Sequence, residues 1–333
     1  MNTYLNKNEI SKSIDLPVLI LVTPCYNEEE VLQETSKRLI SILDELIKEK
    51  KISKNSCMIF VDDGSRDKTW DNIEYLSNKT KYIKGIKLSK NVGHQIALIA
   101  GMEYAVDKCD CLITLDVDLQ DDVEAIKSMI VEYNSGYEVV YGVRSKREKD
   151  VFFKKFSAEM FYHVMKLLGV NIIFNHADYR LLSKRATMFL LSFQERNIFI
   201  RGLVPLIGLR STSVYYERNE RYSGESKYSL YKMLNFALDG ITSFSIFPLR
   251  FISMIGFITF LTSILMIFYV FFVKFFTNKA LPGWASTVLP IYFIGGIQLL
   301  SLGIIGEYLG KIYKETKRRP RYFIEKEALY EKD

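Results

Sequence analysis

The amino-acid sequence predicts an α/β domain with a mostly parallel, doubly wound sheet, followed by a membrane-surface helix and two transmembrane helices. The first observation behind this prediction is the alternation of apolar, strand-like runs with helical patterns over roughly the first 140 residues. Such alternation is typical of parallel sheets covered by helices on both faces. The second observation is a change in composition near residue 240, after which charged residues nearly disappear and two uncharged runs of 23 residues follow.

The predicted elements follow from the apolar pattern, taken in chain order. Residues 18–23 form a continuous, β-branched run that is short enough for a buried parallel strand. Leu32, Leu39, Leu43 and Leu46 then recur on one side of a helix over about residues 28–50. Further strands are expected at 57–61, 83–88, 112–115 and 139–141, and further helices at 68–77, 93–106 and 123–133. Residues 151–210 have a more helical pattern and allow no clear assignment.

The two uncharged runs cover residues 251–273 and 284–306. Each would form about 34 Å of helix, which is enough to cross a hydrocarbon core of about 30 Å. The alternative is a pair of buried helices in a soluble core. Residues 229–243 carry apolar side chains at helical spacing, which predicts an amphipathic helix on the membrane surface or, alternatively, a helix packed on the sheet.

The distribution of charge predicts the orientation in the membrane. The tail after the second run carries six basic residues near its start, whereas the ten residues between the runs carry two. The positive-inside rule therefore places the tail in the cytoplasm, and two spans return the N-terminal domain to the same side. The chain start has no apolar signal-peptide core. The expected domains are a cytosolic catalytic domain (1–228), a juxtamembrane helix (229–248), two transmembrane helices (249–310) and a basic cytosolic tail (311–333).

The remaining composition excludes other classes of protein. The net charge of +6 arises largely beside the predicted membrane spans, so it indicates contacts with anionic lipid rather than with nucleic acid. The four cysteines, Cys25, Cys57, Cys109 and Cys111, match neither a zinc site nor a disulfide framework. They are therefore expected to be reduced and structural.

Three polar clusters follow predicted strands, where an α/β sheet binds its ligands. Their sequences are TPCYNE, DDGS and DVDLQ. Any one of them alone could simply cap a helix or form a turn. In the third, Asp116, Asp118 and Gln120 offer the oxygen ligands that Mg²⁺ or Mn²⁺ prefers. Such a metal would stabilise a departing nucleotide diphosphate. The sequence has no P-loop and no G-x-G-x-x-G after the first strand, which disfavours an NTPase or a dinucleotide oxidoreductase.

Six motifs in order make the pattern specific: TPCYNEEE, VDDGSRDKT, LSKNVGHQIALIAGMEYA, LDVDLQDD, DYRLLSKRA and RYSGESKYSLYKML. Together they resemble the family 2 glycosyltransferases of GT-A fold, among them the bactoprenol glucosyltransferases and, more distantly, the dolichyl-phosphate mannose synthases. The resemblance covers about residues 19–248. One departure is Asp121-Asp122, where the family often has prolines; we expect it to change a helix start rather than a ligand.

The resemblance implies roles for residues of the first, second and fourth motifs. Pro24, Tyr26 and Glu28 would line the nucleotide pocket, and Asp63 would accept a hydrogen bond from the base. The metal and the donor diphosphate would be held by Asp116, Asp118 and Gln120.

The later motifs imply residues around the reacting sugar and the donor. Asp178 and Arg180 would lie beside the reacting sugar and the acceptor phosphate. Phosphate oxygens would be contacted by Arg221, Ser226 and Lys227, on a loop that can close over the donor because Gly224 gives it backbone freedom. Phosphate binding by His94, Arg144 or Arg147 is an alternative to a helix-start role for the histidine and a solvated role for the arginines.

The implied enzyme is a metal-dependent, inverting glycosyltransferase that moves glucose from UDP-glucose to undecaprenyl phosphate. Because a lipid phosphate is already ionised at neutral pH, positioning and charge stabilisation would suffice, and Asp178 would orient the acceptor or stabilise the sugar cation. GDP-mannose or a modified sugar is the alternative donor. A catalytically inactive membrane-tethered scaffold is the alternative from another class. A processive polysaccharide synthase is disfavoured, since the sequence lacks a Gln-x-x-Arg-Trp motif. A separate flippase would turn the product outward, and the Gly306-x-x-x-Gly310 spacing would suit packing in a homo-oligomer.

Overall fold

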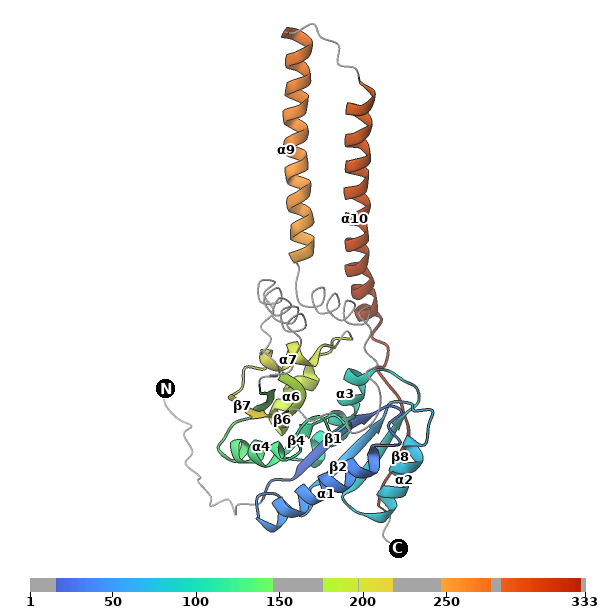
Figure 1. The fold of residues 1–333 in the computed structure, drawn as a ribbon, viewed down its shortest axis with the longest axis vertical. Helices are drawn as coiled ribbons and strands as arrows, with labels where there is room; N and C mark the ends of the chain where they lie inside the picture. Colours follow the sequence, from blue (N-terminus) through green and yellow to red (C-terminus); the bar gives the residue numbers. More distant parts are fainter. Residues whose placement is uncertain (1–15, 146–175, 197, 218–246, 277–282, 331–333) are drawn as a thin grey trace, which may run out of the picture. The chain divides into compact units, whose positions relative to one another are not determined.

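The computed structural model describes residues 16–145, 176–196, 198–217, 247–276 and 283–330. The chain divides into two compact units (Figure 1). The first comprises residues 1–156, 172–227 and 320–333, and contains the sheet. The second comprises residues 157–171 and 228–319, and contains two long helices. The predicted surface helix at 229–243 lies outside the described residues.

An eight-stranded sheet has the strand order β7-β5-β6-β4-β1-β2-β3-β8. Its centre consists of β1 (Leu19–Cys25), β2 (Cys57–Asp62), β3 (Ile83–Leu88) and β4 (Cys111–Thr114). β1 pairs with β2 and β4, and β2 pairs with β3, all in parallel. Every residue of β1, β2 and β4 is buried, as the continuous apolar runs predicted. The predicted mostly parallel α/β sheet is therefore confirmed.

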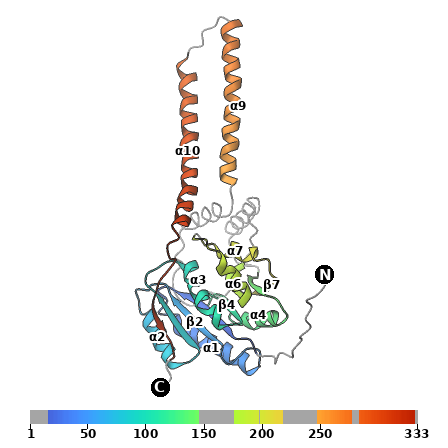
Figure 2. The ribbon, with the colours of Figure 1, turned by 180° about the vertical axis from the view of Figure 1, so that it is seen from behind.

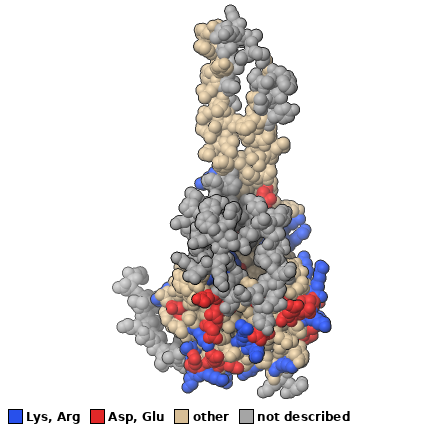
Figure 3. Space-filling view, viewed as in Figure 1, with Lys and Arg blue, Asp and Glu red and all other residues tan. Residues whose placement is uncertain are grey.

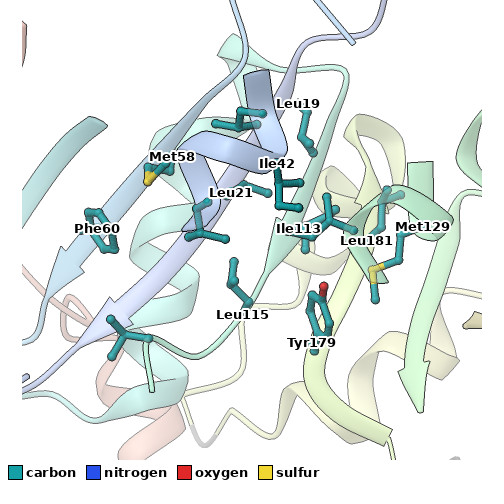
Figure 4. Packing of buried hydrophobic residues seen from close by; sticks show 14 of the residues in the cluster. Leu19, Leu21, Ile42, Met58, Phe60, Ile113, Leu115, Met129, Tyr179 and Leu181 are labelled. Atoms are coloured by element: carbon teal, nitrogen blue, oxygen red, sulfur yellow. The ribbon is translucent and has the colours of Figure 1, made fainter. Parts of the chain in front are cut away.

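Helices cover both faces of these strands. The helices of this half are α1 (Leu32–Lys48), α2 (Thr69–Lys79), α3 (His94–Ala105) and α4 (Ala125–Asn134). Figure 4 shows one core, to which Leu21 of β1, Ile42 of α1 and Met129 of α4 all belong. On the opposite face, α3 contacts β1 and β2. Gly101 allows this close packing, because a Cβ there would lie 2.4 Å from Val22 Cγ1.

The other half of the sheet is mixed. It contains β5 (Val139–Arg144), β6 (His176–Ser183) and β7 (Ser211–Tyr216), with the helices α6 (Lys184–Ser192) and α7 (Ile200–Leu206). β6 lies between β4 and β5 and runs antiparallel to both, and β7 pairs in parallel with β5. In this register Thr114 of β4 faces Arg180 of β6. The start of β6 therefore lies beside the polar loop that leaves the carboxyl end of β4.

The last strand, β8 (Ile324–Ala328), comes from the C-terminal tail and pairs antiparallel with β3 at the edge of the sheet. Figure 2 shows this edge from behind. The tail that the sequence marks only as basic thus contributes a strand to the sheet unit. All four cysteines are buried and free, as predicted.

The second unit contains α9 (Phe247–Phe276) and α10 (Trp284–Lys317). The predicted spans at 251–273 and 284–306 fall within these helices. Among the described residues, one segment, Phe293–Lys317, is long and apolar enough to cross a membrane. The space-filling view shows few charged side chains on the described surface of the two helices, whereas charges gather over the sheet unit (Figure 3). A span at 251–273 stays a prediction.

Candidate active site

The central feature of the site is a histidine between two carboxylates at the carboxyl edge of the parallel strands. His94 is the first residue of α3, Asp116 follows β4, and Asp178 lies on β6. His94 Nε2 lies 3.6 Å from Asp116 Oδ1 and 3.6 Å from Asp178 Oδ2. Thr114 Oγ1 donates a 2.5 Å hydrogen bond to the carbonyl of Asp178, which fixes β6 against β4. The structure thus brings together Thr114 and Asp178, which lie 64 positions apart in the sequence.

The loop after β4 presents the acidic motif. Val117 is buried in the core, and its carbonyl accepts a 2.7 Å hydrogen bond from Thr35 Oγ1 of α1. Leu119 has φ of 56°, a left-handed conformation that costs about 1–2 kcal/mol for a residue with a side chain. The turn lets the Gln120 amide donate to Asp118 Oδ1 at 3.2 Å. Anchored from both sides, this loop holds Asp118 in a nearly buried position.

Asp178 is held by two arginines. Arg180 Nη2 lies 2.5 Å from Asp178 Oδ1, while Arg201 donates to both carboxylate oxygens, from Nε at 3.2 Å and from Nη2 at 3.0 Å. Burial alone would raise the pKa of Asp178, but Arg201, His94 and Arg180 outweigh it and hold the pKa well below the usual range. The carboxylate is therefore ionised at neutral pH. Arg201, on α7, is a site residue that sequence reasoning missed.

Negative charge is concentrated around Asp116. Burial raises its pKa, His94 acts in the opposite direction, and the carboxylates of Asp121, Asp178 and Asp118 raise it further. For His94, burial alone would lower the pKa, yet Asp178 and Asp116 raise it to about 9. The protonated His94 side chain therefore neutralises only part of the negative charge around Asp116. The remaining carboxylate charge would stabilise a further cation.

The donor atoms in this cluster suit a hard metal ion. In the described part of the chain, no group of three or more His, Cys, Asp or Glu side chains is placed to hold a metal. Asp116, Asp118 and Gln120 can offer two carboxylates and one amide oxygen, all of the oxygen type that Mg²⁺ and Mn²⁺ prefer. Mg²⁺ usually takes its other ligands from substrate phosphates and water. The residues present therefore fit a metal that binds together with a diphosphate.

Asp63 connects the second polar cluster to α3. Its two carboxylate oxygens accept hydrogen bonds from the amides of Val92 at 2.7 Å and Gly93 at 2.9 Å. Gly93, with φ of 93°, directly precedes His94 and α3. Asp63 therefore positions the start of α3. The predicted hydrogen bond from a nucleotide base to its carboxylate stays a prediction.

Hydrogen bonds from backbone amides to side-chain hydroxyls connect the first two polar clusters. The Asn27 amide donates to Ser65 Oγ at 3.0 Å and the Glu28 amide to Thr69 Oγ1 at 2.8 Å. Gly64 has φ of 68°, and a Cβ there would lie 2.6 Å from the backbone of Lys90. These contacts bring the loops after β1, β2 and β3 together.

The predicted pocket residues Pro24, Tyr26 and Glu28 lie at the end of β1 and in the loop after it. The Tyr26 side chain is exposed. Their contact with a nucleotide stays a prediction.

Asp121 has a different role from the helix start that the sequence suggested. It is buried, and its Oδ1 accepts hydrogen bonds from Arg144 Nη2 at 2.9 Å and from the Tyr216 hydroxyl at 2.6 Å. Arg144 is thus engaged in a structural network. The turn that precedes α4 is formed instead by Asp122, whose Oδ1 accepts from the Glu124 amide at 3.0 Å. Arg147, Arg221, Gly224, Ser226 and Lys227 lie outside the described residues.

Comparisons with known proteins identify the family of the chain. The model of the family described as Glycosyl transferase family 2 matches residues 20–191. The chain is 48% identical to the uncharacterized glycosyltransferase YkoT of Bacillus subtilis, over 93% of this chain and 91% of that protein. It is 34% identical to a prophage bactoprenol glucosyl transferase homolog of Escherichia coli, over 92% and 98% of the two chains. It is 35% identical to the bactoprenol glucosyl transferase of Shigella phage SfX, over 91% and 97%.

Proposed function

The chain belongs to glycosyl transferase family 2 and is a glycosyltransferase of the GT-A fold class; from this premise, we propose that it transfers glucose from a nucleotide-sugar donor to the phosphate of a polyprenyl lipid. The observation that carries the proposal is the convergence of Asp116 and Asp178 on His94 at the carboxyl edge of the sheet. Relatives with the name bactoprenol glucosyl transferase match more than nine-tenths of the chain and support this acceptor. UDP-glucose and undecaprenyl phosphate are the proposed substrates.

Asp116, Asp118 and Gln120 would hold a divalent metal, Mg²⁺ or Mn²⁺. When bound, such an ion acts as a Lewis acid that neutralises charge on a departing diphosphate. The tightly turned backbone at Leu119 pre-orients the Asp118 carboxylate. Ordering the Asp118 side chain would then add little to the free-energy cost of substrate binding.

Asp178 is the proposed orienting group on the acceptor side. Its lowered pKa makes it a poor proton acceptor, and the ionised acceptor phosphate needs no base. In the proposed reaction a phosphate oxygen bonds to the anomeric carbon while the bond from that carbon to the diphosphate breaks, with inversion. A fixed carboxylate beside the reacting sugar stabilises the positive charge that develops there. Arg180 and Arg201 keep this carboxylate in one position.

We further propose that the enzyme is a multi-pass membrane protein with its catalytic domain and both termini in the cytoplasm. The apolar segment Phe293–Lys317 and the basic residues near its end support this topology. An undecaprenyl acceptor stays in the bilayer, so a membrane-anchored catalytic domain would meet it by diffusion in two dimensions. A product formed on this side would require a separate flippase to reach the outer face.

The test is sugar transfer from radiolabelled UDP-glucose to undecaprenyl phosphate by the full chain in detergent, with Mg²⁺ or Mn²⁺. We expect label in the lipid fraction with the wild type and a loss on the order of a hundredfold or more with Asp118→Asn, since removing a metal ligand removes transition-state stabilisation. Asp122→Asn is the matched control, because it removes a nearby charge and keeps an oxygen that can accept from the Glu124 amide.

The other outcomes separate the alternatives. Transfer from a different nucleotide sugar would correct the donor and keep the reaction. No transfer from any donor, together with no metal-dependent nucleotide binding, would contradict the proposal and favour the inactive scaffold. Full activity of Asp118→Asn would contradict the metal site.

A further inference from the structure

The segment that directly follows α10 is bonded to the sheet unit by Arg321. α10 ends at Lys317, and Arg321 Nη2 donates hydrogen bonds to two backbone carbonyls, those of Phe193 at 2.8 Å and Glu195 at 2.9 Å. Only about a tenth of the Arg321 side chain is exposed. The two carbonyls follow the C-terminal end of α6, where backbone acceptors have no partner within the helix and a cation is favoured.

The neighbouring tail residues attach the same segment to α3. The Tyr322 hydroxyl donates to a Glu103 carboxylate oxygen, and Arg321 Nη1 lies 3.8 Å from the other. Further along, the Tyr104 hydroxyl donates to Glu327 Oε2 at 2.8 Å. Arg321 therefore joins α3 to the end of α6.

The connection between α6 and α7 leads from Arg321 to the reaction centre. At its far end, Gln95 Oε1 of α3 accepts a 3.0 Å hydrogen bond from the Ile200 amide, the first residue of α7. The next residue, Arg201, donates to both oxygens of Asp178. Arg321 thus holds this connection near its start and Gln95 holds it at its end, and the connection leads directly to Arg201, which holds Asp178.

We propose that Arg321 is a positioning residue for sugar transfer, which acts through the α6–α7 connection on the contact between Arg201 and Asp178. This inference rests on the proposed function. A planar guanidinium can donate to two carbonyls at once, which an ammonium on a flexible stem does less well. The sequence marks Arg321 only as one of the six basic residues near the start of the tail, and the structure gives it two hydrogen bonds to the α6–α7 connection.

The first experiment compares kcat and the donor KM of Arg321→Ala and Arg321→Lys with the wild type in the transfer assay. We expect kcat to fall about tenfold in Arg321→Ala, the size of effect expected when bonds from a charged group are lost, with less loss in Arg321→Lys. The donor KM should be unchanged, since Asp116 and Asp118 are untouched. Arg319→Ala is the control for the loss of charge, because it removes one positive charge from an exposed position of the same tail.

A second control separates positioning from stability. Tyr104→Phe removes another tail contact, to Glu327, and leaves the Arg321 carbonyl bonds intact. If Arg321 acts only by holding the tail, Tyr104→Phe and Arg321→Ala will lower both the melting temperature and kcat in proportion. We expect Tyr104→Phe to lower the melting temperature and keep kcat. Should Arg321→Ala fail to fold, Arg321→Lys carries the same comparison.

A double-mutant cycle with Arg201→Lys identifies the route. If Arg321 acts through Arg201, adding Arg321→Ala to Arg201→Lys should lower kcat by less than twofold, because coupled residues are not additive. A full, additional tenfold loss would overturn the inference, as would undiminished kcat in Arg321→Ala. A wild type that transfers no sugar would overturn the proposed function itself, and this inference with it.

Discussion

Asp178 has two arginines and a histidine around one carboxylate, and this set of partners decides its protonation state. Burial works against ionisation, and the three cationic neighbours overcome it. Because the folded-state pKa is lowered, the stabilising contribution of this carboxylate is complete above the pKa of an unfolded aspartate, about 4. It is lost only as the pH falls through the lowered folded value. Asp178 therefore does not titrate in the working range of the enzyme.

Asp178→Asn tests this conclusion. We expect kcat to fall on the order of a hundredfold, because a charge beside the reacting sugar is lost. Between about pH 5 and 8 the wild-type profile should show no acidic limb that is lost in the variant, since the wild-type Asp178 carboxylate stays ionised throughout. The measurement is kcat against pH for both proteins. An acidic limb that is present in the wild type and absent from Asp178→Asn would show instead that Asp178 takes up a proton during turnover.

Site residues differ in how far the sequence predicted them. Asp116 and Asp118 follow a recognisable buried strand, so their place at the edge of the sheet follows from local pattern. Arg201 has no such signal, because it lies in a seven-residue helix and its partner Asp178 is 23 positions away. Its role appears only when β6 and α7 are placed together in space.

At the scale of elements, the close approach of α3 to the sheet positions His94. Gly101 makes this approach possible, since a Cβ there would lie 2.4 Å from Val22 Cγ1 and 2.8 Å from Val61 Cγ2. Both valines are fully buried in the middle of parallel strands. There is no room for the methyl group unless α3 moves away from β1 and β2.

Gly101→Ala should therefore destabilise the protein and lower kcat. Alanine gains about 1 kcal/mol in helix propensity, but overpacking a filled core costs typically 1–3 kcal/mol, and the displaced α3 carries His94. Adding Val22→Ala makes room at the nearer contact, so Gly101→Ala should cost less in that background. The measurement is the melting temperature and kcat of both single variants and the double variant. If Gly101→Ala lowers the melting temperature and kcat equally with Val22 and with Val22→Ala, the close contact between residue 101 and Val22 is contradicted.

The elements that the sequence predicted and those it missed differ in burial. Strands β1, β2 and β4 are buried throughout, and their apolar runs identify them directly. In β3 the apolar residues Ile83, Ile86 and Leu88 are buried and the two lysines are half-buried. β8 reads Ile-Glu-Lys-Glu-Ala, with one buried residue in five, and lies at an edge of the sheet. Hydrophobic periodicity carries little information about an exposed edge strand. β6 was missed for a different reason: its antiparallel insertion between β4 and β5 breaks the β-α alternation from which the parallel strands were predicted.

At the scale of the whole molecule, the central prediction is that the two long helices form a membrane hairpin. The sheet unit contains β8, which follows α10, as well as the described strands β1 to β7, which precede α9. A chain that crosses the membrane twice returns to the side from which it started, so this shared sheet requires an even number of crossings. A single crossing would place β8 and β3 on opposite sides of the bilayer and break their pairing.

Cysteine labelling can test the hairpin, because all four native cysteines are buried in the fold. Gly283→Cys lies at the start of α10, between the two helices, and Lys326→Cys is an exposed position of β8. A membrane-impermeant maleimide added to intact cells should label Gly283→Cys, and should label Lys326→Cys only after permeabilisation. The basic residues near the end of α10 favour this orientation. Labelling of Lys326→Cys in intact cells would reverse the orientation. Protection of both positions until permeabilisation would show that the two helices do not cross the bilayer and lie on its cytoplasmic side.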